Sequence, residues 1–117
     1  MKHILIVDDN HAAADGIVRL LKVLGWSASA QYSGKEALEY VKDNSTALAF
    51  IDIGMPDMDG HATVVALRAA GHEFPAIALT GYGQKEDVDK ALAAGFTAHI
   101  TKPVGVEELK KSLETHL

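Results

Sequence analysis

The sequence of 117 residues contains no cysteine, which excludes a disulfide framework and thiolate chemistry and agrees with a reducing compartment. No apolar run approaches the roughly 20 residues that a membrane-spanning helix needs. The first residues do not have the layout of a signal peptide. A formal net charge of −5 argues against a nucleic-acid-binding surface, which is normally basic. We therefore expect one cytoplasmic domain over residues 1–117, with no membrane segment and no direct contact with nucleic acid.

Linkers, internal repeats and low-complexity segments are also absent from the sequence. Hydrophobic residues make up 48% of the chain, which is enough to form a hydrophobic core. Short apolar runs alternate with longer segments of helical period, at residues 3–7, 27–31, 47–51, 76–80 and 96–100. This alternation predicts βα units and a parallel sheet. Right-handed crossovers then give an α/β, doubly wound (βα)5 sheet, for which we expect the flavodoxin-like strand order 2-1-3-4-5. The run at 27–31 is weakly apolar and predicts an edge strand.

Start and stop signals bound the helical segments. Asn10 is a good N-cap for the first helix, and Ser33 with Glu36 matches a capping box for the second. Glycine in the position after a helix commonly ends it. The predicted later helices run from about 61 to 70, from about 84 to 94 and from about 105 onward, and the expected stops are Gly25, Gly71 and Gly95.

Carboxylates follow two of the predicted strands. Asp8 and Asp9 come after the first run, and Asp52 comes after the third. If these strands are neighbours, the acids crowd into one pocket at the carboxyl edge of the sheet, where ligands bind. Carboxylates at such short distances repel one another unless a cation binds between them, and Mg²⁺ prefers oxygen ligands. The alternative is that each acid is an exposed turn residue, but their combination favours a metal-assisted site.

Two further residues fall at the same predicted edge. Thr80 ends the fourth run, and its hydroxyl can donate a hydrogen bond to an anionic oxygen, although taken alone the residue is better explained as an ordinary β-branched strand residue. Lys102 follows the fifth run and can reach the acids as a point charge, or lie solvated before a turn. The bond to Pro103 allows a cis peptide. The six histidines show no metal-ligand spacing; His11 is closest to the acids and is expected to be an exposed first-turn residue.

These residues, taken in order, resemble the receiver domain of two-component response regulators. The features that carry the resemblance are Asp8-Asp9, the segment from Asp52 to Gly60, Thr80-Gly81 and Lys102-Pro103. The resemblance covers essentially the whole chain. It extends to single-domain chemotaxis regulators and to the receivers of hybrid sensor kinases.

The resemblance implies a phosphoaccepting signalling switch rather than an enzyme, with only autocatalytic phosphoryl acceptance and hydrolysis. Asp52 would be the phosphoacceptor, and a sensor histidine kinase or a histidine phosphotransfer protein would be the donor. The response would appear on the surface of the fourth helix, fifth strand and fifth helix. The downstream partner stays open.

The family also implies roles for the neighbours of the phosphoacceptor. Mg²⁺ would be bound directly by Asp9, by the phosphoacceptor itself and by the backbone carbonyl of Gly54, with Asp8 acting through a metal-bound water. Thr80 and Lys102 would each contact a phosphoryl oxygen. Such positioning and charge neutralisation are the main sources of catalysis in phosphoryl transfer.

Several positions depart from the family pattern or bear on alternatives. His99 stands where an aromatic residue is usual, and Gly105 replaces a common aspartate cap. A phosphatase of the haloacid-dehalogenase type would have an aspartate at Gly54, whereas a pseudo-receiver would lack an acid or the lysine. Gly54 and Tyr82 flank the expected path of an attacking water, and we predict slow autodephosphorylation.

Overall fold

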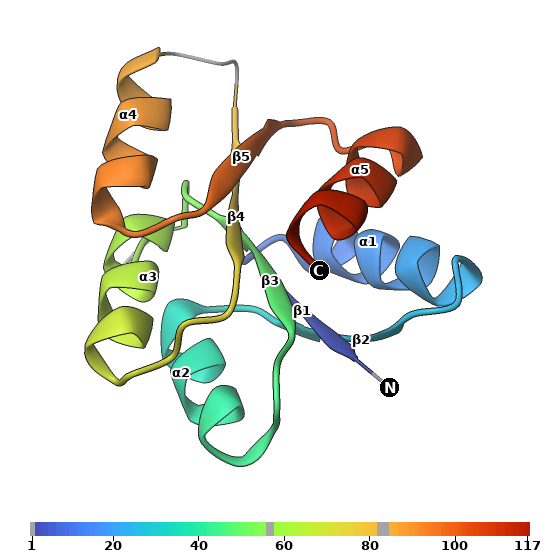
Figure 1. Cartoon of the computed structure of the whole chain (residues 1–117), viewed down its shortest axis with the longest axis horizontal. Coiled ribbons are helices and arrows are strands. Elements are labelled where there is room, and N and C mark those ends of the chain that lie inside the picture. Colours follow the sequence, from blue (N-terminus) through green and yellow to red (C-terminus); the bar gives the residue numbers. More distant parts are fainter. Residues whose placement is uncertain (1, 56–57, 82–84) are drawn as a thin grey trace.

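The computed structural model describes residues 2–55, 58–81 and 85–117, and for residues 85–87 it describes the backbone alone. Its strands are parallel and form one sheet in the order β2-β1-β3-β4-β5 (Figure 1). They are β1 (His3–Val7), β2 (Ser27–Gln31), β3 (Leu48–Asp52), β4 (Ala76–Thr80) and β5 (Ala98–Thr101). The predicted flavodoxin-like architecture, its strand order and the edge position of β2 are confirmed.

Helices cover both faces of the sheet, as Figure 1 shows. They are α1 (His11–Val23), α2 (Gly34–Asp43), α3 (Gly60–Ala69), α4 (Lys85–Ala94) and α5 (Val106–His116). Apolar residues of α1 and α5 pack with one face of the central strands, and those of α2, α3 and α4 pack with the other face. All residues of β3 and β4 are buried, because both faces of these strands are covered. This arrangement leaves the carboxyl edge of the sheet available for a site.

The predicted helix signals act as expected. Asn10 Oδ1 accepts a hydrogen bond from Ala13 N at 3.1 Å, and Ser33 Oγ accepts one from Glu36 N at 3.1 Å. The Glu36 carboxylate reaches back to Tyr32 N at 3.2 Å, one residue earlier than in a reciprocal capping box. The predicted helix stops have positive φ angles, which glycine adopts without strain: Gly25 (93°), Gly71 (91°) and Gly95 (122°).

The strands differ slightly from their predicted bounds. β3 begins and ends one residue later than predicted, and β5 begins at Ala98 rather than at residue 96. The reason for the second shift is that Gly95 N and Phe96 N still bond to the last carbonyls of α4, at 3.2 and 3.1 Å. The chain can join β4 only after this C-terminal motif is complete.

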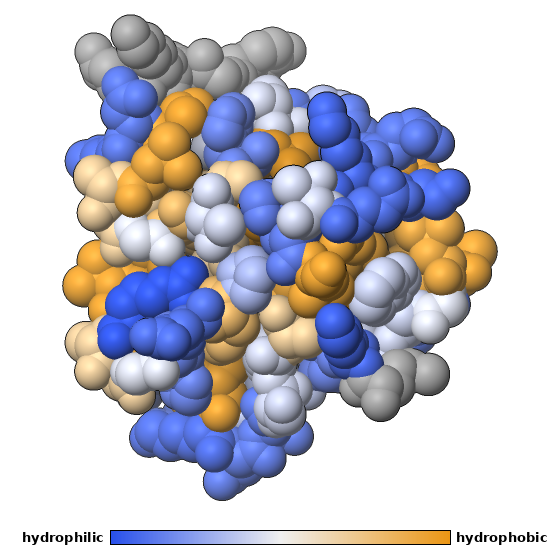
Figure 2. Space-filling view, in the orientation of Figure 1, coloured by the Kyte–Doolittle hydropathy of each residue, from blue (hydrophilic) through white to orange (hydrophobic). Residues whose placement is uncertain are grey.

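The surface carries its hydrophobic residues in several separate small areas on the face seen in Figure 2. Scattered exposed apolar side chains of this kind are normal and need no partner. Among the described residues, none of the helices has the length and apolar character to cross a membrane.

Candidate functional site

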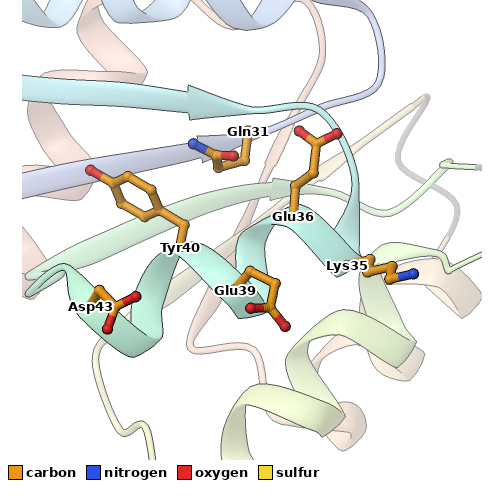
Figure 3. Close-up of a pocket in the computed structure, with 6 residues that line it drawn as sticks. All are labelled: Gln31, Lys35, Glu36, Glu39, Tyr40 and Asp43. Carbon is orange, nitrogen blue, oxygen red and sulfur yellow. The ribbon is translucent and has the colours of Figure 1, made fainter.

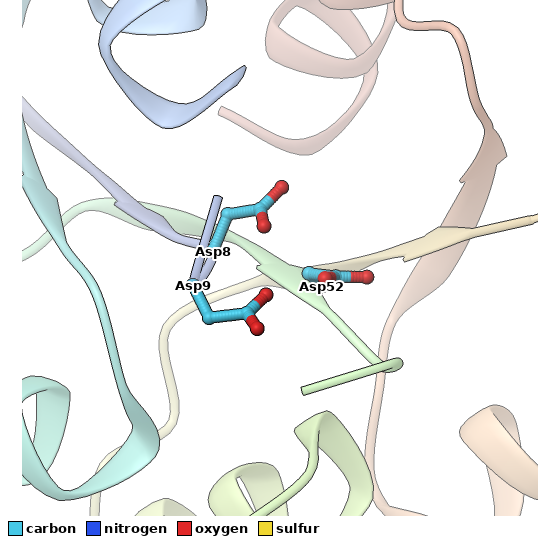
Figure 4. Close-up of side chains that lie close together, drawn as sticks. All are labelled: Asp8, Asp9 and Asp52. Carbon is cyan, nitrogen blue, oxygen red and sulfur yellow. The ribbon is translucent and has the colours of Figure 1, made fainter. Parts of the chain in front are cut away.

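The three predicted acids meet at the carboxyl edge of β1 and β3. Val7 lies beside Ile51 in the strand register, so the residues that follow them are neighbours. Asp8, Asp9 and Asp52 each offer a carboxylate oxygen, and these oxygens lie within 4.8 Å of one another (Figure 4). Asp8 and Asp52 are buried, whereas Asp9 is exposed. The adjacency predicted from the strand order is therefore present.

Backbone groups hold the two buried carboxylates in place. Asn10 N donates to Asp8 Oδ1 at 3.0 Å, and Gly54 N donates to Asp52 Oδ1 at 3.1 Å. The start of α3 also packs directly on the backbone of β3, because a Cβ on Gly60 would lie 2.5 Å from Asp52 O. A side chain at this position would push the helix away from the acid. Glycine thus fixes how closely α3 approaches the site.

Lys102 joins the two buried acids. Its Nζ lies 3.2 Å from Asp8 Oδ2 and 3.3 Å from Asp52 Oδ1. Burial alone lowers the pKa of this ammonium group, but the charges of Asp52 and Asp8 outweigh burial and raise it. The peptide bond to Pro103 is cis, as the sequence allows. Lys102 therefore lies where the sequence predicted, as a cation shared by two carboxylates.

The charge of Asp52 is only partly compensated. Burial raises the pKa of its carboxyl group, the Gly54 N–H lowers it, the nearby Asp8 charge raises it and Lys102 lowers it, and the net effect is an increase. One lysine thus faces two buried acids and an exposed one. An added cation would relieve this excess of negative charge.

Thr80 lies at the predicted edge, but its hydroxyl is engaged elsewhere. The side chain is buried, and Oγ1 donates to the backbone carbonyl of Ile100 on the neighbouring strand at 3.3 Å. The structure therefore places Thr80 next to the site without bringing its donor to the acids.

A cavity of about 510 Å³ opens on Asp52 and extends toward α3 and α4. Its lining includes three residues that the sequence analysis did not single out: Asp59, His61 and Lys90. Asp59 and His61 flank the glycine that begins α3, so their closeness to the acidic loop was a usable signal. Lys90 had no such signal, because its position depends on how α4 packs.

The remaining predicted residues lie outside this cluster. His11 is exposed at the start of α1 and stacks on Tyr32, with ring centroids 3.7 Å apart. His99 is exposed on β5, and Gly105 begins α5 with no side-chain cap. Tyr82 lies outside the described residues, so its predicted shielding role stays a prediction.

A second polar region lies at the other end of β1. The imidazole of His3 contacts Ser27 Oγ through Nδ1 at 2.6 Å, and its Nε2 lies 3.0 Å from Ser29 Oγ and 2.8 Å from the Tyr40 hydroxyl. We call these four residues the His3 network. Tyr40 also borders a shallow hollow beside α2, which Figure 3 shows with mostly polar and charged side chains.

Comparison with known proteins identifies the family. The sequence profile of the response regulator receiver domain matches residues 4–114, so the chain belongs to this family. Receiver domains act in two-component signal transduction, are not classical enzymes and bind Mg²⁺ at an acidic cluster. They interact with histidine kinases or phosphotransfer proteins. This match disfavours the phosphatase alternative.

Individual relatives agree with the family. The chain is 35% identical over 115 residues to an uncharacterized 14.6 kDa protein of Leptolyngbya boryana, covering 97% of this chain and 88% of that protein. It is 32% identical over 114 residues to the transcriptional regulatory protein ZraR of Salmonella typhimurium, covering 97% of this chain but only 26% of that protein. Chemotaxis protein CheY4 of Vibrio cholerae matches in structure, with a TM-score of 0.94, 28% identity and coverage of 100% and 99%.

Proposed function

We propose that this domain is a phosphoaccepting switch of a two-component phosphorelay. In this proposal Asp52 takes a phosphoryl group from a sensor histidine kinase or a histidine phosphotransfer protein. The observation that carries it is the convergence of Asp8, Asp52 and Lys102 Nζ, with both ion-pair distances at or below 3.3 Å, beside a cavity that opens on Asp52. We also propose that residues 1–117 act as one such domain.

The donor set fits Mg²⁺. Three carboxylate oxygens within 4.8 Å of one another are the hard ligands that this ion prefers. Asp9, Asp52 and the carbonyl of Gly54 would hold it directly, and Asp8 would act through a bound water. When bound, the ion would neutralise charge on the transferring phosphoryl oxygens.

The chain's own residues divide the transfer between them. A carboxylate oxygen of Asp52 forms the new bond to phosphorus while the bond from phosphorus to the donor's imidazole nitrogen breaks and its electron pair stays on that nitrogen. Lys102 favours the ionised carboxylate and can then turn to a phosphoryl oxygen. Thr80 can donate to another phosphoryl oxygen once it leaves Ile100 O.

The new charge would then bias the fold. A phosphoryl group at Asp52 adds negative charge to a pocket that already has an excess of it, which favours inward movement of Thr80 and Lys102. We propose the surface of α4, β5 and α5 as the responding face, with exposed His99 in the usual aromatic position.

The test is labelling by acetyl phosphate in the presence of Mg²⁺, measured by intact mass. The wild type should gain one phosphoryl group and Asp52→Asn should gain none, because the nucleophile is missing. Asp43→Asn makes the same change of charge at an exposed position of α2 and should label like the wild type. Equal labelling of Asp52→Asn and wild type would contradict the assignment. An unlabelled wild type would instead favour the pseudo-receiver.

A further inference from the structure

Of the three acids in the cluster, Asp9 has the least support for its own carboxylate. Asp8 and Asp52 are buried and accept backbone hydrogen bonds at 3.0 and 3.1 Å, whereas Asp9 is exposed. Among the described residues, the hydrogen bonds and ion pairs of the cluster involve Asp8 and Asp52 but not Asp9. The position of the Asp9 carboxylate therefore depends on the backbone of the β1–α1 loop, residues 8–10.

Hydrogen bonds hold this loop on the side of the sheet. Asp8 N donates to the carbonyl of Gln31, the last residue of β2, at 3.2 Å. Asn10 N donates to Asp8 Oδ1 at 3.0 Å, and Asn10 Oδ1 accepts from Ala13 N at 3.1 Å. The bond to Ala13 is exposed, so water competes with it. Further support at the start of α1 would therefore help to keep Asp9 in place.

Tyr32, the residue after β2, supplies such support. Its ring stacks on the imidazole of His11 in the first turn of α1, with centroids 3.7 Å apart and an angle of 9° between the planes. Its hydroxyl donates to Asp15 Oδ1, one turn later on α1, at 2.6 Å. Its backbone N donates to the Glu36 carboxylate of α2 at 3.2 Å. Tyr32 thus joins the end of β2 to the first two turns of α1, directly after the acidic loop.

The Tyr32 side chain is itself well fixed. Its ring packs against the part of the core that α1 and α5 cover. The hydrogen bond to Asp15, more than burial or nearby charge, raises the pKa of the hydroxyl, which therefore stays protonated and able to donate at neutral pH. The His11 ring is exposed by comparison. The fixed ring of this pair is therefore Tyr32, and the ring that it holds is His11.

We propose that Tyr32 is a positioning residue for the metal site: through His11 it holds the start of α1, and it thereby keeps the Asp9 carboxylate in place before a cation binds. A group that is already in place loses less conformational freedom on binding, so the affinity is higher. The inference rests on the Mg²⁺ site of the proposed function and specifies which residue outside the acidic cluster sets its affinity.

Two substitutions separate the ring of Tyr32 from its hydroxyl. Tyr32→Leu removes the stack and the hydrogen bond, and should raise the Mg²⁺ dissociation constant about 3- to 10-fold, less than is usual when a group bonded directly to a metal ligand is lost. Tyr32→Phe keeps the stack and should raise the constant by less than about twofold. Amide shifts of Asp9 and Gly54 during a Mg²⁺ titration, followed by NMR, measure both constants.

Tyr40→Leu is the matched control. Tyr40 is also a half-buried tyrosine whose hydroxyl makes a hydrogen bond, to His3 Nε2 at 2.8 Å, but it lies at the opposite end of the sheet. This variant should be less stable than the wild type and should bind Mg²⁺ equally well. If it weakens Mg²⁺ binding as much as Tyr32→Leu does, the effect reflects a general loss of stability, and the positioning role is overturned.

Substitutions of His11 test the path from Tyr32 to the loop. His11→Ala removes the partner of the stack and should weaken Mg²⁺ binding as much as Tyr32→Leu, whereas His11→Phe keeps a stacking ring and should bind like the wild type. Because both residues act through one contact, the double variant Tyr32→Leu/His11→Ala should lose no more affinity than either single variant. Losses that add, or a His11→Phe protein as weak as His11→Ala, would overturn the proposal.

Hydrogen exchange of the metal-free protein tests the support of the loop without Mg²⁺. Tyr32→Leu should speed the exchange of the Asn10 and Ala13 amides severalfold, and it should leave unchanged the Gly54 amide, which is bonded to Asp52 in another loop. Unchanged exchange at Asn10, or an equal increase at all three amides, would overturn the positioning role. A wild type that binds no Mg²⁺ but shows the expected exchange pattern would contradict the proposed metal site alone. A wild type that binds Mg²⁺, shows the expected losses and is not labelled by acetyl phosphate would contradict the phosphoacceptor role alone.

Discussion

The two ends of the sheet both cluster polar groups, partly buried at the amino end and buried at the carboxyl end, and their chemistry is opposite. At the amino end, the His3 network pairs an imidazole with three hydroxyl groups at 2.6–3.0 Å. At the carboxyl end, two buried carboxylates share one lysine. Burial raises the pKa of Asp52, whereas burial first and Lys22 second lower the pKa of His3, so each group is shifted toward its neutral form. At the amino end the hydrogen bonds of His3 are made, and they contribute to stability. At the carboxyl end the negative charge is only partly balanced, so a bound cation or an added charge can alter the arrangement there.

The largest expected effect is at the carboxyl end. Lys102→Met keeps much of the side-chain volume but leaves Asp8 and Asp52 without their shared cation. Because Lys102 is partly exposed, we expect a loss of about 1–3 kcal/mol in the free energy of unfolding, below the cost of breaking a fully buried pair. Urea unfolding in metal-free buffer measures this loss.

Repeating the unfolding measurement with Mg²⁺ tests whether a metal ion can replace the charge of the lysine. If an outside cation can balance the acids, millimolar Mg²⁺ should restore more stability to Lys102→Met than it adds to the wild type. Lys110→Met, at an exposed position of α5, is the control and should change little. Equal stability of Lys102→Met and wild type without metal would show that the acids do not need the lysine.

A smaller effect is expected at the amino end. Tyr40→Phe removes one hydroxyl from His3 Nε2 and leaves the ring in place, which should cost about 1 kcal/mol of unfolding free energy. Labelling of Asp52 by acetyl phosphate should stay at the wild-type level. A change in labelling without a change in stability would mean that the two ends of the sheet are not independent.

The smallest expected effect is a pH dependence from His3. Its pKa in the folded protein lies below the ordinary value of 6.5, so below that pH the unfolded chain binds the proton first. Stability should therefore be complete above this value and fall as the pH is lowered from it through the folded pKa. His3→Gln should lack this component in urea unfolding measured across the range. An identical pH profile in both proteins would exclude the contribution.

The sequence predicted the strands and the acids at their ends from local signals, and it predicted the meeting of the acids from the strand order expected for a doubly wound sheet. Apolar runs ending in Asp8 and Asp52 mark the strand ends, and the strand order brings them together. The bond from Thr80 to Ile100, and the places of His61 and Lys90 in the cavity, could not be predicted in the same way. The first depends on how the side chains of β4 are oriented toward β5, and the others depend on how α3 packs against α4. No local sequence pattern encodes either arrangement.

The hydrogen bond of Thr80 has a consequence of its own. A threonine hydroxyl carries one proton, so it cannot donate to Ile100 O and to another oxygen at full strength at once. If the Thr80 hydroxyl donates to another acceptor, the carbonyl of Ile100, two residues before Lys102, loses this hydrogen bond. If a phosphoryl oxygen at Asp52 accepted this proton instead, the change would reach the backbone of β5 through the carbonyl of Ile100.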